Sequence, residues 1–165
     1  MNKILINYNN LYRYYKIEKV NLSILEDRKE KIRNQYFKTT SQPSNSSSKT
    51  NKKYENYDAY MIALEKEQIF EKIQEKRNLI NRLSYYLKKI EYNLSQLQGT
   101  EYQLFFKIIN GINISKAIKE IAEENYFNNK KIKDESIIWK KYYPNIKKEI
   151  LEFKKIQEEV IKIYE

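Results

Sequence analysis

The feature that most restricts the fold is an apolar ladder in the middle of the chain, whose successive positions are four and three residues apart. Its members are Ile62, Lys66, Ile69, Ile73, Lys76, Ile80, Leu83, Leu87, Ile90, Leu94 and Leu97. This alternation keeps one narrow stripe on the same side of an α-helix. The ladder therefore predicts one helix over residues 56–97, about 60 Å long at a rise of about 1.5 Å per residue. Such a stripe must be covered by another helix.

A second ladder precedes the first. It consists of Leu11, Tyr15, Leu22, Leu25, Ile32 and Tyr36, with Glu18 and Lys29 as polar interruptions. It predicts a helix over residues 7–37 that folds back antiparallel over the long helix. Because this helix is the shorter one, part of the long stripe is left for C-terminal residues or for a second copy of the chain. An intramolecular bundle and a homodimer are therefore alternatives.

The segment between the two ladders is polar. Residues 39–48 are Thr, Ser, Gln, Asn and a single Pro, and they cannot bury enough apolar surface to offset the entropy lost on ordering. We expect a flexible linker over residues 39–56.

Composition favours helices throughout and excludes several kinds of site. The 165 residues include only 2 Gly and 2 Pro, which argues against an architecture of strands and turns. There is no Cys and no His, so disulfides, thiolate nucleophiles, imidazole bases and the usual zinc sites are absent. We expect no cofactor, no metal and no enzymatic activity. No apolar run approaches the roughly 18 residues of a membrane span, so we also expect a cytoplasmic protein without a membrane partner.

The charge of the chain points to a polyanionic partner. The formal net charge is +10, and residues 128–148 alone hold seven basic against two acidic side chains. Basic side chains favour nucleic acid because each phosphate contact releases condensed counterions. The abundance of Lys, Asn, Ile and Tyr is also typical of a very AT-rich genome, which leaves a second explanation for the charge open.

The last third of the chain is predicted to form short helices and then a longer one. Gly99 ends the long helix, and Thr100 with Gln103 forms a capping box that starts the next helix. The buried face of that helix consists of Leu104, Phe105, Ile108 and Ile109, and Gly111 closes it. A short aromatic and basic helix follows Asp134.

Pro144 then ends or kinks the short helix and starts a final one. The apolar positions of this final helix are Ile146, Ile150, Phe153, Ile156, Val160 and Ile163.

The order of these segments resembles a known family. The Thr100-x-x-Gln103 start, Leu104-Phe105, residues 118–124 (IKEIAEE) and residues 136–139 (SIIW) are similar to the sigma-70 region 4 helix-turn-helix found in small phage and prophage regulators of the RinA and ArpU type. Those proteins also share an N-terminal helix that begins Leu-Tyr-x-Tyr, here residues 11–14, and a polar linker before a long helix rich in Glu and Lys. The resemblance covers nearly the whole chain.

The resemblance implies that the helix after Asp134 reads the promoter major groove and that the preceding helix supports it, with Ile118, Ile121 and Ala122 as its core. The residues expected to contact DNA are Lys130, Lys131, Lys133, Ser136, Lys140, Lys141, Tyr143 and Lys147. Trp139 is expected in the core. The carboxylates Glu120, Glu123 and Glu124 are expected to form a solvated helix face.

Together these expectations describe an all-α protein. A long antiparallel coiled-coil hairpin, residues 1–98, precedes a helix-turn-helix domain with a C-terminal helix, residues 99–165. The expected function is that of a sequence-specific DNA-binding transcription regulator in a bacterial host cell, which binds a promoter and recruits RNA polymerase without bond chemistry. The alternative is a small phage-encoded helical protein, an inhibitor or adaptor, that binds a host protein through its coiled arm.

Overall fold

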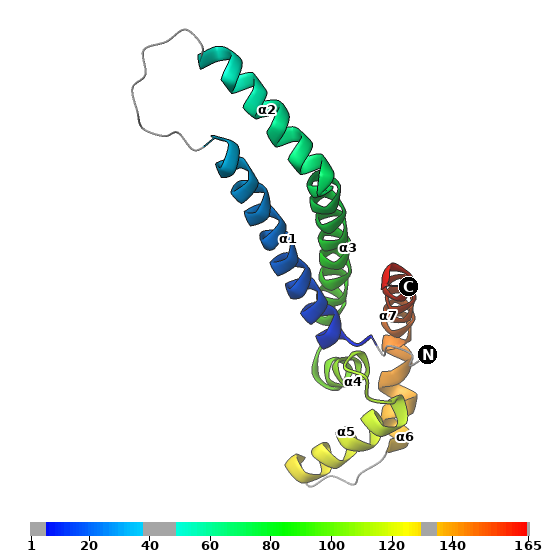
Figure 1. Cartoon of the computed structure of the whole chain (residues 1–165). Coiled ribbons are helices and arrows are strands. Elements are labelled where there is room, and N and C mark those ends of the chain that lie inside the picture. The colour runs from blue at the N-terminus through cyan, green and yellow to red at the C-terminus, as the bar shows by residue number, and fades with distance from the viewer. Residues whose placement is uncertain (1–5, 38–48, 130–134, 165) are drawn as a thin grey trace. The chain divides into compact units, whose positions relative to one another are not determined.

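The computed structural model describes residues 6–37, 49–129 and 135–164, and only the backbone of residues 49–55 and 128–129. These parts of the chain are all-α, with no strand among them (Figure 1). The elements are α1 (Tyr8–Phe37), α2 (Lys49–Lys66), α3 (Ile69–Gln96), α4 (Gly99–Ile109), α5 (Ile114–Asn129), α6 (Glu135–Ile137), the π-helix η1 (Ile138–Tyr142) and α7 (Tyr143–Tyr164).

The chain divides into two compact units. The central unit is residues 15–82, and the C-terminal unit is residues 83–165 together with residues 1–14. Both α1 and α3 therefore contribute to each unit. The boundary that we expected between residues 98 and 99 lies inside the C-terminal unit.

The first helix of the chain agrees closely with its ladder. It begins at Tyr8, and the Asn7 side chain caps it, because the backbone N–H of Asn10 donates to Asn7 Oδ1 at 2.8 Å. In the central unit the buried apolar side chains are Ile32, Tyr60, Leu64, Ile69 and Ile73, and Leu22, Leu25, Tyr36 and Phe37 pack against them.

The long helix expected over residues 56–97 is two helices in the structure. The chain turns between α2 and α3, and Gln68 has a φ of 51°, which is rare for a residue other than glycine. Side chains hold this turn: Arg28 donates to both carboxylate oxygens of Glu67, at 2.6 and 3.0 Å, and Lys72 Nζ donates to the Glu67 carbonyl oxygen at 2.7 Å. Because the turn rotates α2 relative to the ladder, Tyr60 and Leu64 are buried and Ile62 is exposed.

Part of the segment predicted as a flexible linker is helical. Residues 49–56 belong to α2, so this part of the prediction over residues 39–56 was wrong. Residues 39–48 lie outside the part of the chain that the structure describes.

In the C-terminal unit the two glycines mark the ends of helices. Gly99 has a φ of 54°, but α4 begins at Gly99 itself after Gln98, which makes no side-chain cap bond, so the capping box predicted at Thr100 does not form. Gly111 has a φ of 93° and ends α4 in a Schellman motif. In this motif Ile112 N donates to Lys107 O at 3.1 Å, and Gly111 N donates to Ile108 O at 3.0 Å.

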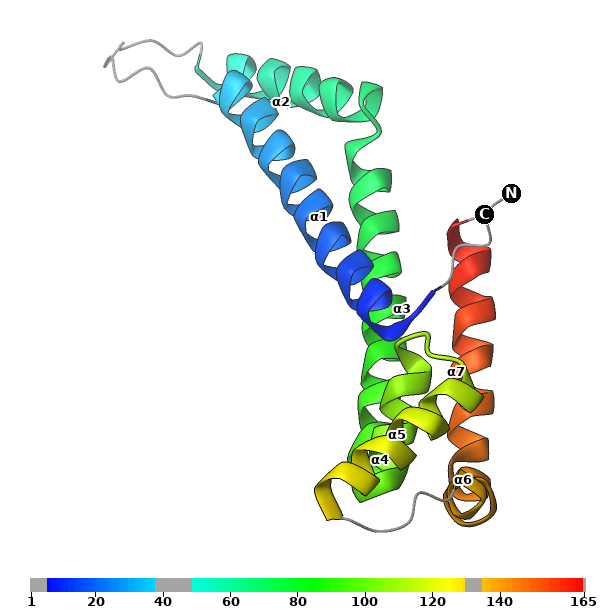
Figure 2. The same ribbon diagram turned by 90° about the horizontal axis from the view of Figure 1, so that it is seen from below.

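Helix α4 is the centre of the C-terminal unit, since it packs against both α5 and α7 (Figure 2). Its Leu104, Phe105 and Ile109 are buried, as predicted, and Ile108 is half-buried. The predicted core positions of the neighbouring helices are buried too: Ile118, Ile121 and Ala122 on α5, and Ile146, Ile150, Phe153, Ile156 and Val160 on α7. Helix α5 in turn packs against α6 and η1.

Candidate nucleic-acid interface

The short helix predicted after Asp134 is formed by α6 and η1, and α7 follows it without a non-helical residue between them. The π-turn is closed by the N–H of Tyr143, which donates to the carbonyl of Ile138 five residues earlier. Pro144 is the second residue of α7, one position later than predicted. Because proline has no N–H and its ring crowds the preceding turn, it favours a bend here. Figures 1 and 2 together show the helix axis changing direction where η1 meets α7.

The middle of this helical run carries mainly positive charge on its exposed side, between the exposed Glu135 before it and the exposed Glu158 and Glu159 after it. Between residues 136 and 157 every exposed charged side chain is a lysine. We call these six residues the lysine surface: Lys140, Lys141, Lys147, Lys148, Lys154 and Lys155. The two acidic residues of the same stretch are half-buried, and Glu152 accepts a hydrogen bond from Asn93 Nδ2 at 3.1 Å. A dense positive surface whose two interspersed carboxylates are half-buried suits a polyanion.

The structure places five of the predicted DNA-contacting residues on this run. Ser136, Lys140, Lys141 and Lys147 are exposed, and Tyr143 is half-buried. Lys130, Lys131 and Lys133 lie outside the described residues.

Trp139 differs from its prediction, because it is 39% exposed instead of belonging to the core. Its ring meets the edge of the Tyr143 ring, with centroids 5.0 Å apart. The buried residue of the π-helix is instead its neighbour Ile138.

Three lysines of the surface were missed by sequence reasoning: Lys148, Lys154 and Lys155. A signal for them is present in the sequence, because Lys-Lys pairs recur every seven residues at 140, 147 and 154. Seven residues are close to two helical turns, so the pairs fall on one side of a helix.

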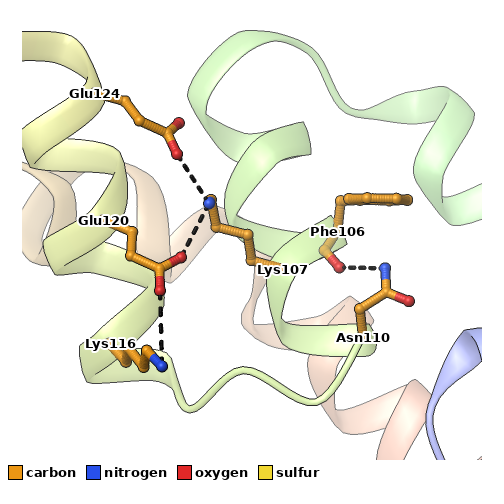
Figure 3. Close-up of polar contacts among 6 residues, drawn as sticks. All are labelled: Phe106, Lys107, Asn110, Lys116, Glu120 and Glu124. Carbon is orange, nitrogen blue, oxygen red and sulfur yellow. Dashed lines mark hydrogen bonds and ion pairs between the residues drawn. The ribbon is translucent and has the colours of Figure 1, made fainter. Parts of the chain in front are cut away.

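An ion cluster joins α4 to α5, the helix that packs against α6 and η1 (Figure 3). Lys107 Nζ lies 3.0 Å from a carboxylate oxygen of Glu120 and 3.0 Å from one of Glu124. The hydrogen bond that Lys107 donates to Glu124 is the main cause that raises the pKa of Lys107. The bond that it donates to Glu120 raises this pKa further, and partial desolvation opposes both. The expected solvated face of α5 is thus partly an ion-paired one.

The C-terminal end of α4 lies next to this cluster. Beside it, Asn110 Nδ2 donates to the Phe106 carbonyl at 2.9 Å at the end of α4 (Figure 3). Within residues 6–37, 49–129 and 135–164 no three acidic side chains are grouped so that they could hold a metal ion.

Comparison of the chain with models of protein families gives no match, and comparisons with curated proteins and with solved structures give none either. The resemblance to region 4 regulators therefore stays a prediction. No helix in the described part of the chain combines the length and the apolar character needed to cross a bilayer.

Proposed function

We propose that this protein is a sequence-specific DNA-binding transcription regulator of the phage or prophage type, which binds a promoter and recruits RNA polymerase. The observation that carries the proposal is the lysine surface on η1 and α7. Each of its lysines can neutralise one phosphate and release a counterion, and this supplies most of the affinity of non-specific binding and a large share of specific binding.

The arrangement of α5 with α6 and η1 supports the same proposal. A supporting helix with a fully buried apolar side packs against a short helix with exposed polar side chains, as in a helix-turn-helix. Ser136, Lys140 and Lys141 would then lie at the DNA, and Tyr143 with Lys147 would extend the contact. In this account the protein positions a polymerase and performs no bond chemistry.

The salt dependence of binding tests the proposal. The full chain is titrated against a fluorescent duplex from its own locus and against an unrelated duplex of the same length, at several salt concentrations. We expect tighter binding to the first duplex, and a logarithm of affinity that falls linearly with the logarithm of salt by about 0.9 per phosphate contact. Failure to bind either duplex at low salt would remove the proposal.

One observation favours a second function, that of a helical protein which binds a host protein through α1. The exposed side of α1 in the central unit carries Ile17, Val20 and Ile24, three and four residues apart, and Val20 and Ile24 are each 59% exposed. This is the spacing of a seam between two helices. Binding through such a seam would persist at high salt, whereas phosphate binding would not.

A further inference from the structure

The lysines of α7 are arranged in two rows. Lys147 and Lys154 are seven residues apart, as are Lys148 and Lys155, and all four are exposed on the regular part of α7 beyond Pro144. Seven residues advance a helix by about 10.5 Å and leave it rotated by only about 20°. Neighbouring residues differ by about 100° around the axis, so the two rows run side by side along α7.

An exposed leucine lies between the rows, and the exposed Glu158, seven residues after it, follows on the same side of α7 beyond the last lysine of these rows. Leu151 is four residues after Lys147 and three after Lys148, so it lies between the two rows, and it is 51% exposed. The opposite side of α7 belongs to the core, because Ile146, Ile150 and Phe153 are buried and α7 packs against α4. Both rows therefore lie on the side of α7 that turns away from α4.

We propose that α7 lies in the major groove of B-form DNA, with one lysine row contacting the phosphates of each strand. A major groove about 12 Å wide, bordered by a phosphate row on each side, admits one α-helix of about 10–12 Å diameter. Two rows of cations with Leu151 between them match that pattern of charge over residues 147–155. A single strand offers one backbone instead of two, and the major groove of duplex RNA is too narrow for side chains to enter.

This inference rests on the proposed function and changes one part of it. The segment formed by α6 and η1 has eight residues and bends away from α7, so α7 is the longer and more regular helix to occupy the groove. Lys140 and Lys141, at the bend, then contact phosphates at the edge of the groove.

The test compares the two rows in the full chain. One variant is Lys147→Gln with Lys154→Gln, the second is Lys148→Gln with Lys155→Gln, and the control is Lys31→Gln with Lys88→Gln, which removes two exposed lysines of α1 and α3. Binding to a duplex and to one of its strands is measured across a range of salt. We expect each row variant to reduce the salt slope for the duplex by about 1.8, two contacts at about 0.9 each, and the control to leave it unchanged.

Three outcomes overturn the inference: unchanged slopes in both row variants, a reduced slope in only one of them, or binding of the parent chain to polyglutamate as tightly as to the duplex. If the parent chain binds DNA but both row variants keep the same salt slope as the control, the proposed function stands and this inference fails. If the parent chain binds no DNA, both fail.

Discussion

Two of the polar residues that interrupt the ladders, Glu18 on α1 and Lys76 on α3, meet in an ion pair. Their Oε2 and Nζ atoms are 2.6 Å apart, and Glu18 is only 8% exposed. A buried carboxylate with a single cationic partner fixes the register of the two helices, because any shift along the axis would leave it unpaired. Both positions were visible in the sequence as interruptions. Their pairing was not, since it depends on where the chain folds back.

Removing the lysine of this pair should destabilise the protein. Lys76→Met leaves the Glu18 carboxylate buried without its cation, which we expect to lower the free energy of unfolding by about 1–3 kcal/mol. Adding Glu18→Leu should recover most of the loss. Arg77→Met is the control, because its ion pair with Glu26 is exposed on both sides and should contribute less than about 1 kcal/mol. Urea unfolding measures all three, and equal losses in Lys76→Met and Arg77→Met would show that the burial of Glu18 has no energetic consequence.

The Lys107 cluster gives a second prediction at the same scale. Lys107→Met removes the cation that pairs with both Glu120 and Glu124, and we expect the free energy of unfolding to fall by about 1 kcal/mol. Lys116→Met is the matched control, because Lys116 is exposed and its Nζ lies 4.0 Å from Glu120.

The pKa of Lys107 is raised above its ordinary 10.5, so its stabilisation is fully present at neutral pH and is lost as the pH rises through the folded-state value. Thermal melts at neutral and strongly alkaline pH check the sign. If the difference in melting temperature between the parent chain and Lys107→Met grew at alkaline pH, the raised pKa of Lys107 would be contradicted.

At the scale of the elements, periodicity predicted the helices well wherever one apolar side is buried. The bounds of α1, the buried side of α7 and the ladder from Ile69 to Leu94 follow from sequence spacing. The turn at Gln68 could not be predicted, because the spacing continues through it and contacts with Arg28 and Lys72 hold it. The predicted start of α4 was wrong, because Gly99 begins this helix, whereas a glycine usually follows the end of one.

A charge in the buried stripe of α3 should not be tolerated. Leu87→Asp buries an unpaired carboxylate between Leu83 and Ile90, all of them buried, and we expect the free energy of unfolding to fall by several kcal/mol, about 3–5. Tyr92→Asp, at an exposed position of the same helix, is the control and should change stability by about 0.5 kcal/mol or less. Chemical denaturation of both variants decides the matter, and a Leu87→Asp variant as stable as the parent would mean that the stripe is not part of the core.

At the scale of the whole molecule, the sequence predicted the all-helical class from composition and spacing, and it predicted part of the candidate interface. Ser136, Lys140, Lys141 and Lys147 were predicted from their place after Asp134, and the structure leaves them exposed. The rest of the lysine surface could not be separated from the general excess of lysine without knowing which carboxylates are turned inward. The ladder positions of α3 from Ile69 to Leu94 are buried or half-buried within a single chain, so covering that stripe requires no second copy. A homodimer stays a prediction.

The most direct test of the account is the binding of Lys140→Ala with Lys141→Ala to a duplex from the protein's own locus, measured beside the parent chain. Because both side chains are exposed, the fold should persist, which circular dichroism verifies. We expect a loss of about 1–3 kcal/mol, or roughly 5- to 150-fold in affinity, while Lys31→Ala with Lys88→Ala binds nearly as the parent does. A folded Lys140→Ala, Lys141→Ala variant that binds this duplex as tightly as the parent would contradict the claim that the lysine surface contacts DNA.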